Sequence, residues 1–307
     1  MHLSLQRFGL LGFVLVMGGL FSVLSPYFLS LRNLTNIFVQ SAVHIIVAVG
    51  STLVIATAGI DLSVGAIVAL SGIITAAALR SGMEVFLGTS LGILSGAILG
   101  FVNGIGVARL SISPFIVTLG TAGIYRALSL IFTEARPIYG MPLSFRAIGT
   151  GQLGPIPVSV ALAMAVVGLA HFIVSSTRFG TNARAIGDSP EASFRMGVPV
   201  AATQMGVYTL SGITASLGGM VVTARLNTAE AIAGWGIELE AIAAVVIGGT
   251  TFSGGQARIL GTLLGALLIG TLNNGLTLCN VPSYYQQLVV GLVFVLAVVA
   301  DRFRGRI

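Results

Sequence analysis

Long apolar runs separated by short polar stretches dominate this sequence of 307 residues. Most runs reach the roughly 17–25 residues that a membrane-spanning helix needs. The pattern predicts an all-α integral membrane protein with about ten transmembrane helices, in a single domain over residues 1–307. The first run is too long for a cleaved leader, so we interpret it as a retained span. The apolar segments are 8–29, 37–60, 62–79, 85–108, 115–133, 158–174, 200–224, 235–252, 259–279 and 284–300.

The eighth segment is the least regular. Its uncharged part, Ala241 to Phe252, would be about 18 Å long as a helix, which is shorter than the hydrocarbon core. It could cross at a slant or be re-entrant. The loop 175–199 and the C-terminal tail 301–307 are the richest in arginine. These two parts lie on the same side of the membrane only if an even number of crossings separates them. This favours a crossing by the eighth segment.

Composition excludes a soluble globular protein, because only 8% of the residues are charged against the usual value of about 25%. The basic residues are arginines scattered over loops, so we do not expect a nucleic acid partner. Cytoplasmic loops of membrane proteins carry the basic excess. If the N- and C-termini lie in the cytoplasm, nine arginines face the cytoplasm and five face outward, and Arg126 lies within a span. The five outer arginines would be Arg32, Arg80, Arg136, Arg146 and Arg225.

The loop 134–157 is long and rich in proline, with Pro137, Pro142, Pro155 and Pro157. Proline lacks a backbone donor and breaks regular elements. We therefore expect an irregular cap over the external mouth of the protein.

The loop 175–199 is polar and would lie in the cytoplasm. Asp188 or Ser189 can cap a helix, Pro190 suits its first position, and Glu191 suits its positive end. Gly197 can end it in the left-handed conformation. The pattern predicts an exposed helix of about two turns, and we expect another molecule to dock there.

Nucleotide- and metal-binding motifs are absent from the sequence. It contains no GxxxxGK[ST] loop for ATP and no HExxH, and its three histidines are dispersed. Cys279 is the only cysteine, so no disulfide forms within the chain. We therefore predict no catalytic residue, no metal site and no cofactor bound by this chain.

Polar residues within apolar segments are costly in a membrane, so they are candidates for a passage or gate. Each could instead bond a neighbouring helix: Asp61 could cap segment 62–79, and Arg126 could bind an acid or backbone carbonyls. The spacing of Gly100 and Asn103 faintly resembles that of Gly270 and Asn273, which suggests an inverted five-plus-five repeat. The passage candidates are Gln40, His44, Asp61, Ser63, Asn103, Arg126, Glu238, Glu240, Asn273 and Asn274.

Several long motifs resemble one family. TAGIDLSVGAIVALSG begins at Thr57, and GFVNGIGVARLSISPFIVTLGTAGIYRAL begins at Gly100. AIGDSPEASFRMGV begins at Ala185, and ELEAIAAVVIGGTTFSGGQARILGTLLGALL begins at Glu238. In this order, and over nearly the whole chain, they resemble the permeases of ribose-type sugar ABC transporters.

This resemblance implies the inner-membrane subunit of an importer that works by alternating access. Its partners would be a second permease chain in a homodimer or heterodimer, a cytoplasmic ABC ATPase that holds ATP and Mg²⁺, and a periplasmic or surface-anchored binding protein. The substrate would be a pentose, a hexose or a related polyol. The rival functions are a stand-alone secondary carrier or channel for a small polar solute and, less favoured, an enzyme acting on a lipid-linked sugar.

The resemblance also makes Ser189 to Gly197 the coupling helix that docks on the ATPase. The loop departs from the family's usual AIGGNPEAARLSGI at positions 188–189 and 194–195, which bears on the ATPase it accepts and makes Phe194 a candidate apolar anchor. The implied coupling residues are Arg184, Asp188, Ser189, Pro190, Glu191, Phe194, Arg195 and Gly197.

Overall fold

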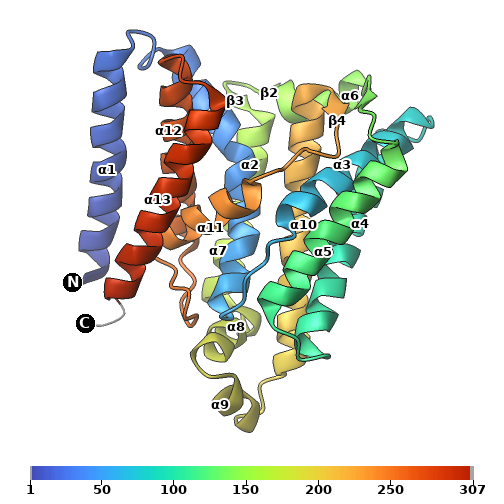
Figure 1. Ribbon diagram of the computed structural model, residues 1–307, viewed down its shortest axis with the longest axis vertical. Coiled ribbons are helices and arrows are strands. Elements are labelled where there is room, and N and C mark those ends of the chain that lie inside the picture. The colour runs from blue at the N-terminus through green and yellow to red at the C-terminus, as the bar shows by residue number, and fades with distance from the viewer. Residues whose placement is uncertain (1, 305–307) are drawn as a thin grey trace.

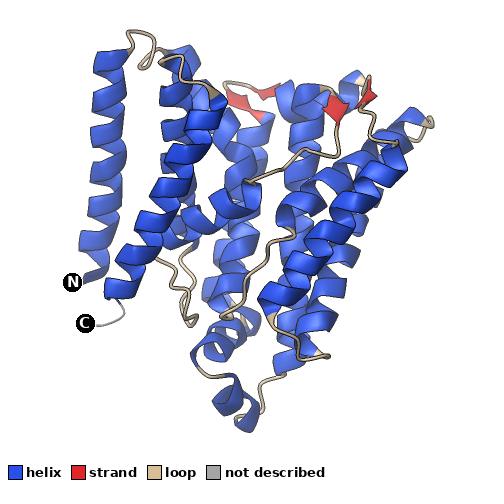
Figure 2. Cartoon of the chain, in the orientation of Figure 1, coloured by secondary structure: helices blue, strands red, loops and turns tan. Residues whose placement is uncertain are grey.

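The computed structural model describes residues 2–304, and helices form most of it (Figures 1 and 2). Four two-residue strands lie in the connections: β1 (Ile138–Tyr139), β2 (Gln152–Leu153), β3 (Ile156–Pro157) and β4 (Thr228–Ala229). The helices are α1 (His2–Leu24), α2 (Leu31–Ala56), α3 (Val64–Arg80), α4 (Val85–Ala108), α5 (Pro114–Thr133), α6 (Leu143–Thr150), α7 (Val158–Ser176), α8 (Arg178–Asp188), α9 (Pro190–Arg195), α10 (Val200–Leu226), α11 (Ile237–Ile247), α12 (Ile259–Leu278) and α13 (Ser283–Arg304).

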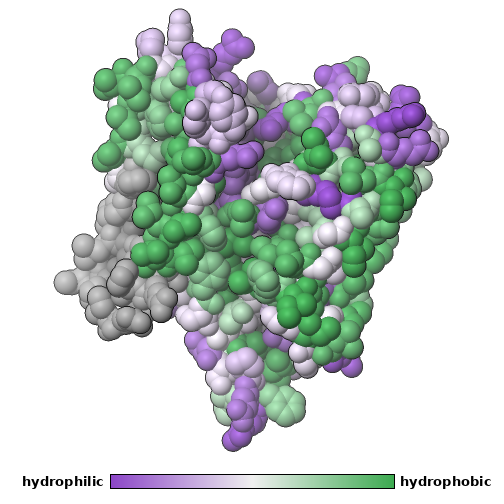
Figure 3. Space-filling view, in the orientation of Figure 1, coloured by the Kyte–Doolittle hydropathy of each residue, from purple (hydrophilic) through white to green (hydrophobic). Residues whose placement is uncertain are grey.

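The all-α membrane class is confirmed. Among the described residues, six helices are long and apolar enough to cross a bilayer: α2, α4, α5, α7, α10 and α12. Shorter apolar stretches occupy Val14–Leu24, Val64–Arg80 and Ser283–Leu296. Each predicted segment overlaps a helix, but the number of crossings and the inverted repeat remain predictions. On the face that Figure 3 shows, apolar side chains cover much of the middle of the molecule, and polar side chains gather toward both ends.

Three helices form the centre of the bundle. The most apolar window of α2 is 78% buried, and α10 and α12 are also mostly buried, whereas the window of α5 is only 17% buried. A methyl group on Gly96 of α4 would lie 2.5 Å from the carbonyl oxygen of Gly212 on α10. Small residues therefore let these backbones approach closely, as the glycine content of the spans suggests.

The loop 134–157 is more ordered than the expected irregular cap. It contains α6 and two antiparallel strand pairs, β1 with β4 and β2 with β3. Phe145 of α6 is fully buried and, with Met141, packs in a cluster that includes Met220 and Ala224 of α10. The proline content obscured this burial, because it suggests irregular backbone without showing which apolar residues have a neighbour.

The loop 175–199 contains a second helix that sequence reasoning missed. The Thr177 hydroxyl caps α8 by accepting a hydrogen bond from the Gly180 N–H at 3.2 Å. Ala183 and Ile186 of α8 are buried against the bundle. The helix is amphipathic but short and rich in arginine, so its sequence resembles that of an ordinary polar loop.

Both described chain ends lie at the same end of the bundle as α8 and α9 (Figure 1). Residues 305–307 of the tail lie outside the described residues. Which side of the membrane this end faces remains a prediction, and we call it the α9 end. The opposite end, where α6 and the strand pairs lie, is called the α6 end.

The chain between α10 and α12 passes from the α6 end to the α9 end without a continuous helix. It leaves α10, pairs with β1 through β4, and forms α11, whose 11 residues span only about 16 Å. It then descends to the α9 end, where the Gly255 N–H donates to the Ala56 carbonyl at 3.0 Å. The eighth segment is therefore a short helix between two irregular stretches (Figure 1).

Candidate functional site

A helix is present where the sequence predicts one, as α9 over Pro190–Arg195. The Ser189 hydroxyl accepts a hydrogen bond from the Ala192 N–H at 3.2 Å, so Ser189 rather than Asp188 is the cap. Pro190 occupies the first turn, as predicted. Gly197 has φ of +81°, and its N–H donates to the Phe194 carbonyl at 3.0 Å. The predicted start and stop signals therefore both operate.

The outer surface of α9 combines apolar and charged side chains. Phe194 is 74% exposed and Met196 is 84% exposed. The helix α9 itself lies beyond the end of the bundle (Figure 1). Glu191 and Arg195 form an exposed ion pair of 2.6 Å one turn apart. Ser193 is buried and faces the protein. Large apolar side chains rimmed by charges are typical of a surface that another protein covers.

The other two predicted coupling residues lie on α8. Arg184 Nε donates to the Gly180 carbonyl at 3.3 Å, within its own helix. Asp188 ends α8 beside Gly255, where a side chain on that glycine would collide with the carboxylate. Gly187 faces the same loop, since a methyl group on Gly254 would lie 2.8 Å from its Cα. The end of α8 therefore contacts both the loop after α11 and the end of α2.

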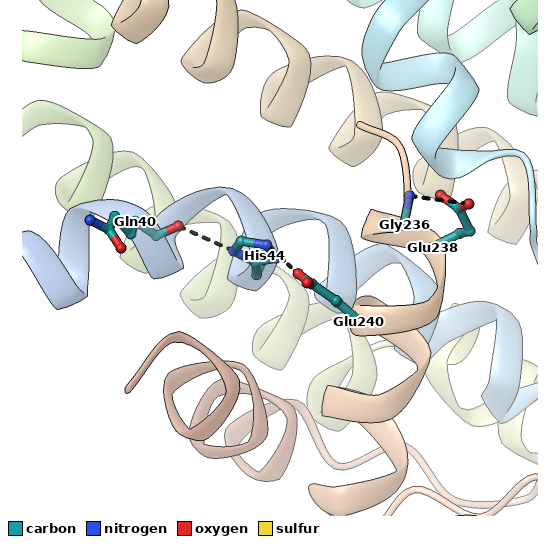
Figure 4. A network of polar contacts seen from close by, with 5 residues as sticks. All are labelled: Gln40, His44, Gly236, Glu238 and Glu240. Carbon is teal, nitrogen blue, oxygen red and sulfur yellow. Dashed lines mark hydrogen bonds and ion pairs between the residues drawn. The ribbon is translucent and has the colours of Figure 1, made fainter. Parts of the chain in front are cut away.

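Four of the predicted passage residues come together in the half of the bundle nearer the α6 end. His44 Nε2 lies 2.5 Å from Glu240 Oε2, and His44 Nδ1 lies 3.2 Å from the Gln40 carbonyl oxygen (Figure 4). The Asn273 side chain of α12 also lies close to Glu240. Both ring nitrogens of His44 thus face acceptors, an arrangement that the doubly protonated imidazolium satisfies.

A cavity of about 320 Å³ lies beside this cluster. Two buried polar atoms of its lining residues, Arg225 Nη1 and Asn273 Oδ1, have no hydrogen-bond partner among the described residues. Sequence reasoning missed Arg225 because it follows the apolar segment 200–224 and reads as a loop residue, whereas α10 continues to Leu226. It also missed Asn36. The lining consists of Asn36, Val39, Gln40, His44, Arg225, Gly270 and Asn273.

Three other passage candidates form a separate buried cluster around Asp61. Its carboxylate accepts hydrogen bonds from the Ser63 N–H at 3.0 Å, the Ser63 hydroxyl at 2.6 Å and the Ser211 hydroxyl at 2.9 Å. Asn103 Nδ2 donates to the Ser63 hydroxyl at 2.7 Å. Asp61 therefore ties the start of α3 to α4 and α10. Its bond to the Ser63 N–H lies one residue before α3, whose N-terminus has no side-chain cap, so the predicted capping of the helix itself is not seen.

Arg126 and Glu238 lie beside the irregular stretch before α11. Arg126 Nη1 donates to the carbonyls of Ala231 at 2.6 Å and Ala233 at 2.8 Å. Its guanidinium also lies 5.4 Å from the centre of the Trp235 ring. Glu238 accepts from the Gly236 N–H at 3.4 Å and points away from Glu240 (Figure 4). Arg126 thus holds this stretch through backbone carbonyls. The sequence allowed this as one alternative to a place in the passage, the other being an ion pair with an acid.

Asn274 lies apart from the cavity lining, although it neighbours Asn273. Asn274 Oδ1 accepts from Asn33 Nδ2 at 2.9 Å, and Asn33 Oδ1 accepts from Asn274 Nδ2 at 3.0 Å. This reciprocal amide pair joins α2 to α12. In this structure Asn274 therefore makes a contact between helices. The sequence allowed such a contact as the alternative to a place in the passage.

Within residues 2–304, no group of three histidine, cysteine or acidic side chains could hold a metal ion. The polar side chains instead form four separate groups along the bundle. Such clusters can hydrogen-bond a polar solute or one another.

Comparisons with known proteins cover almost the entire chain. The family described as branched-chain amino acid transport system / permease component matches residues 33–298. The D-allose transport system permease protein AlsC of Escherichia coli (strain K12) is 41% identical over 97% of this chain and 92% of its own length. The ribose import permease protein RbsC of Bacillus subtilis (strain 168) is 42% identical over 94% of this chain and 90% of its own.

A third relative is more distant. The galactose/methyl galactoside import permease protein MglC of Escherichia coli (strain K12) is 35% identical over 98% of this chain and 95% of its own length. No solved structure matches the chain.

Proposed function

Because the chain belongs to the ribose-type family of sugar ABC-transporter permeases, which are multi-pass inner-membrane proteins, we propose that it is the membrane subunit of an importer that carries one monosaccharide into the cell. The single observation that carries the proposal is the identity of 41% and 42%, over more than nine tenths of the chain, to permeases named for D-allose and ribose. The family description mentions branched-chain amino acids, but these two names are both sugars.

The substrate is a pentose or hexose, and it enters by alternating access. A solute-binding protein delivers it at the α6 end, and an ABC ATPase docks at the α9 end, which faces the cytoplasm. ATP and Mg²⁺ bind to that ATPase, while this chain holds neither. The exposed Phe194 and Met196, rimmed by Glu191 and Arg195, support α9 as the docking element.

A second permease chain completes the pathway, as a homodimer or a heterodimer. Closure of the ATPase pair on ATP moves the two coupling helices together. The permease chains then rock and open the pathway outward, and hydrolysis returns them. The break of the eighth segment into a short helix between irregular stretches supports a pathway beside it, because irregular backbone within a membrane protein is found where it lines a cavity or packs in protein.

The test is to purify this chain from its native membrane in mild detergent and identify by mass spectrometry what accompanies it. We expect a Walker-motif ATPase in stoichiometric amount, and the reconstituted complex should import a sugar only with ATP. Recovery of the chain alone, with flux of solute in ATP-free liposomes, would refute the importer and favour the stand-alone carrier.

A crosslink covers the case in which the ATPase dissociates during purification. A cysteine at Met196, which is exposed at the tip beyond α9, should crosslink to an ATPase in intact membranes, with Cys279 replaced by serine. A cysteine at Leu153, exposed at the α6 end, is the matched control and should not. If neither position captures an ATPase, the proposed docking at α9 is wrong.

A further inference from the structure

Two residues that line the cavity beside His44 each have one polar atom without a hydrogen-bond partner, one a donor and the other an acceptor. Arg225 Nη1 is a buried donor without an acceptor, and Asn273 Oδ1 is a buried acceptor without a donor. Both residues line the same cavity of about 320 Å³. Buried polar groups in proteins are nearly always paired, because an unpaired one loses its bonds to water and gains nothing. Both atoms belong to residues that line the cavity, so a ligand seated there is one means of pairing them.

The neighbouring contacts fix the direction in which Asn273 presents its oxygen. Its side chain lies close to Glu240, and a carboxylate can only accept, so the amide nitrogen of Asn273 is the atom that suits that side. The amide oxygen is then left for the cavity. Glu240 itself is held at 2.5 Å by His44. The walls of the site are thus set by the chain before any ligand arrives.

The chemistry of the two atoms selects the ligand. A hydroxyl group can accept from Arg225 and donate to Asn273, and two hydroxyls on one ring can do both at once. A phosphate or carboxylate could accept from Arg225 but has no hydrogen for Asn273, and it would face Glu240. A cation would face Arg225. An uncharged compound with several hydroxyl groups is the class that meets both needs.

The remaining lining agrees with a sugar. Asn36 and Gln40 add amide groups that can donate and accept, and both are exposed at the mouth of the cavity. Only Val39 and Gly270 of the seven lining residues are apolar. A branched-chain amino acid would place its hydrocarbon side chain against amides there. The volume lies near the lower limit of the roughly 300–1,000 Å³ of small-molecule sites, which suits one sugar ring.

We propose that this cavity is a binding site for one uncharged monosaccharide inside the permease chain, with Arg225 and Asn273 as its principal ligands and Gln40 and Asn36 at its mouth. The inference rests on the proposed function, in which a sugar passes through this chain. It adds a discrete, saturable site that exists in the absence of the binding protein and the ATPase. The permease would then itself contribute to the selection of the substrate.

The test measures binding to the purified full chain in nanodiscs by equilibrium dialysis. The probes are radiolabelled D-ribose, D-allose and D-galactose, with D-ribose 5-phosphate and L-leucine as rivals. We expect saturable binding of at least one neutral sugar and none of the sugar phosphate or leucine. Asn273→Leu and Arg225→Met should each weaken binding about 10- to 100-fold, because each removes a hydrogen bond that the sugar would make.

The control is Ser41→Ala, which removes another unpaired buried hydroxyl on α2 next to Gln40 and outside the cavity lining. It should leave binding unchanged. Melting of the sugar-free chain separates a binding role from a structural one. Since Nη1 of Arg225 bonds nothing in the chain, Arg225→Met should melt at the same temperature or higher. A large loss of melting temperature would instead make Arg225 structural and overturn its assignment as a ligand.

Uptake by the complete complex distinguishes the two proposals. If the complex imports one of the three sugars while the chain alone binds none, or while the Arg225 and Asn273 variants bind and import normally, the cavity site is wrong and the importer stands. If leucine binds and is imported and no sugar is, both proposals fall. If sugar binds the chain but is taken up without ATP, the site stands and the importer falls.

Discussion

Phe194 offers the sharpest test of how this chain engages an ATPase. Its side chain is 74% exposed at the tip of α9, and the helix does not depend on it, because Ser189 and Gly197 supply the caps. Phe194→Ser should therefore leave the chain folded and inserted in the membrane. It removes only the apolar surface that a partner would cover.

The size of the effect follows from the exposed area. Complete burial of a phenylalanine side chain contributes about 1.5–3 kcal/mol. About three quarters of Phe194 remains to be buried, so docking over it would contribute about 1–2 kcal/mol. The affinity of the ATPase for the permease should therefore fall about 5- to 30-fold in Phe194→Ser.

The assay measures binding of the copurifying ATPase to the permease in nanodiscs, together with ATP-driven uptake in proteoliposomes. Leu153→Ser is the matched control, because Leu153 is 61% exposed but lies in β2 at the opposite end of the bundle. It should change neither quantity. Equal affinities for Phe194→Ser, Leu153→Ser and the unchanged chain would refute α9 as the docking surface.

Three further predictions follow from single contacts. Gly197→Leu places a side chain at φ of +81°, which costs about 1–2 kcal/mol. The variant should still insert in the membrane but import less sugar per ATP hydrolysed, and an unchanged ratio of sugar to ATP would contradict this. Asn274→Leu should lower the unfolding free energy by about 1–3 kcal/mol, because it leaves Asn33 unpaired. In a double-mutant cycle, Asn33→Leu/Asn274→Leu should lose less unfolding free energy than the two single variants lose together, and strict additivity would count against the amide pair. Arg126→Gln breaks two bonds to backbone carbonyls and should shift the fluorescence of Trp235, the only tryptophan, while an unchanged spectrum would show that Arg126 does not hold this stretch.

Local signals predicted the elements that depend on neighbouring residues. The cap at Ser189, Pro190 in the first turn and the left-handed glycine at 197 act within a few residues, so the sequence alone places α9 correctly. The apolar segments overlap the observed helices for the same reason. The order in α6 was not predictable, because the burial of Phe145 depends on Met220, 75 positions further along the chain.

The candidate site shows the same division. Polarity within an apolar segment identified Gln40, His44, Glu240 and Asn273 as unusual, but could not show which residues meet. Asn273 and Asn274 are adjacent and chemically identical, yet one lines the cavity and the other joins α2 to α12. Helical geometry turns neighbouring residues about 100° apart, so their partners depend on how α12 is rotated in the bundle. That rotation is set by packing over the whole helix.

A short stretch of chain links the neighbourhood of the cavity to the α9 end of the bundle. At the α9 end, the Gly255 N–H bonds the last residue of α2, and the same loop lies against Gly187 of α8, in the helix that precedes α9. The next regular element toward the N-terminus is α11, which holds Glu240 against His44 beside the cavity. A side chain on Gly255 would collide with Asp188, and its φ of +78° already favours glycine. Under the proposed function, displacement of α9 by an ATPase therefore reaches the cavity through α8, this glycine loop and α11.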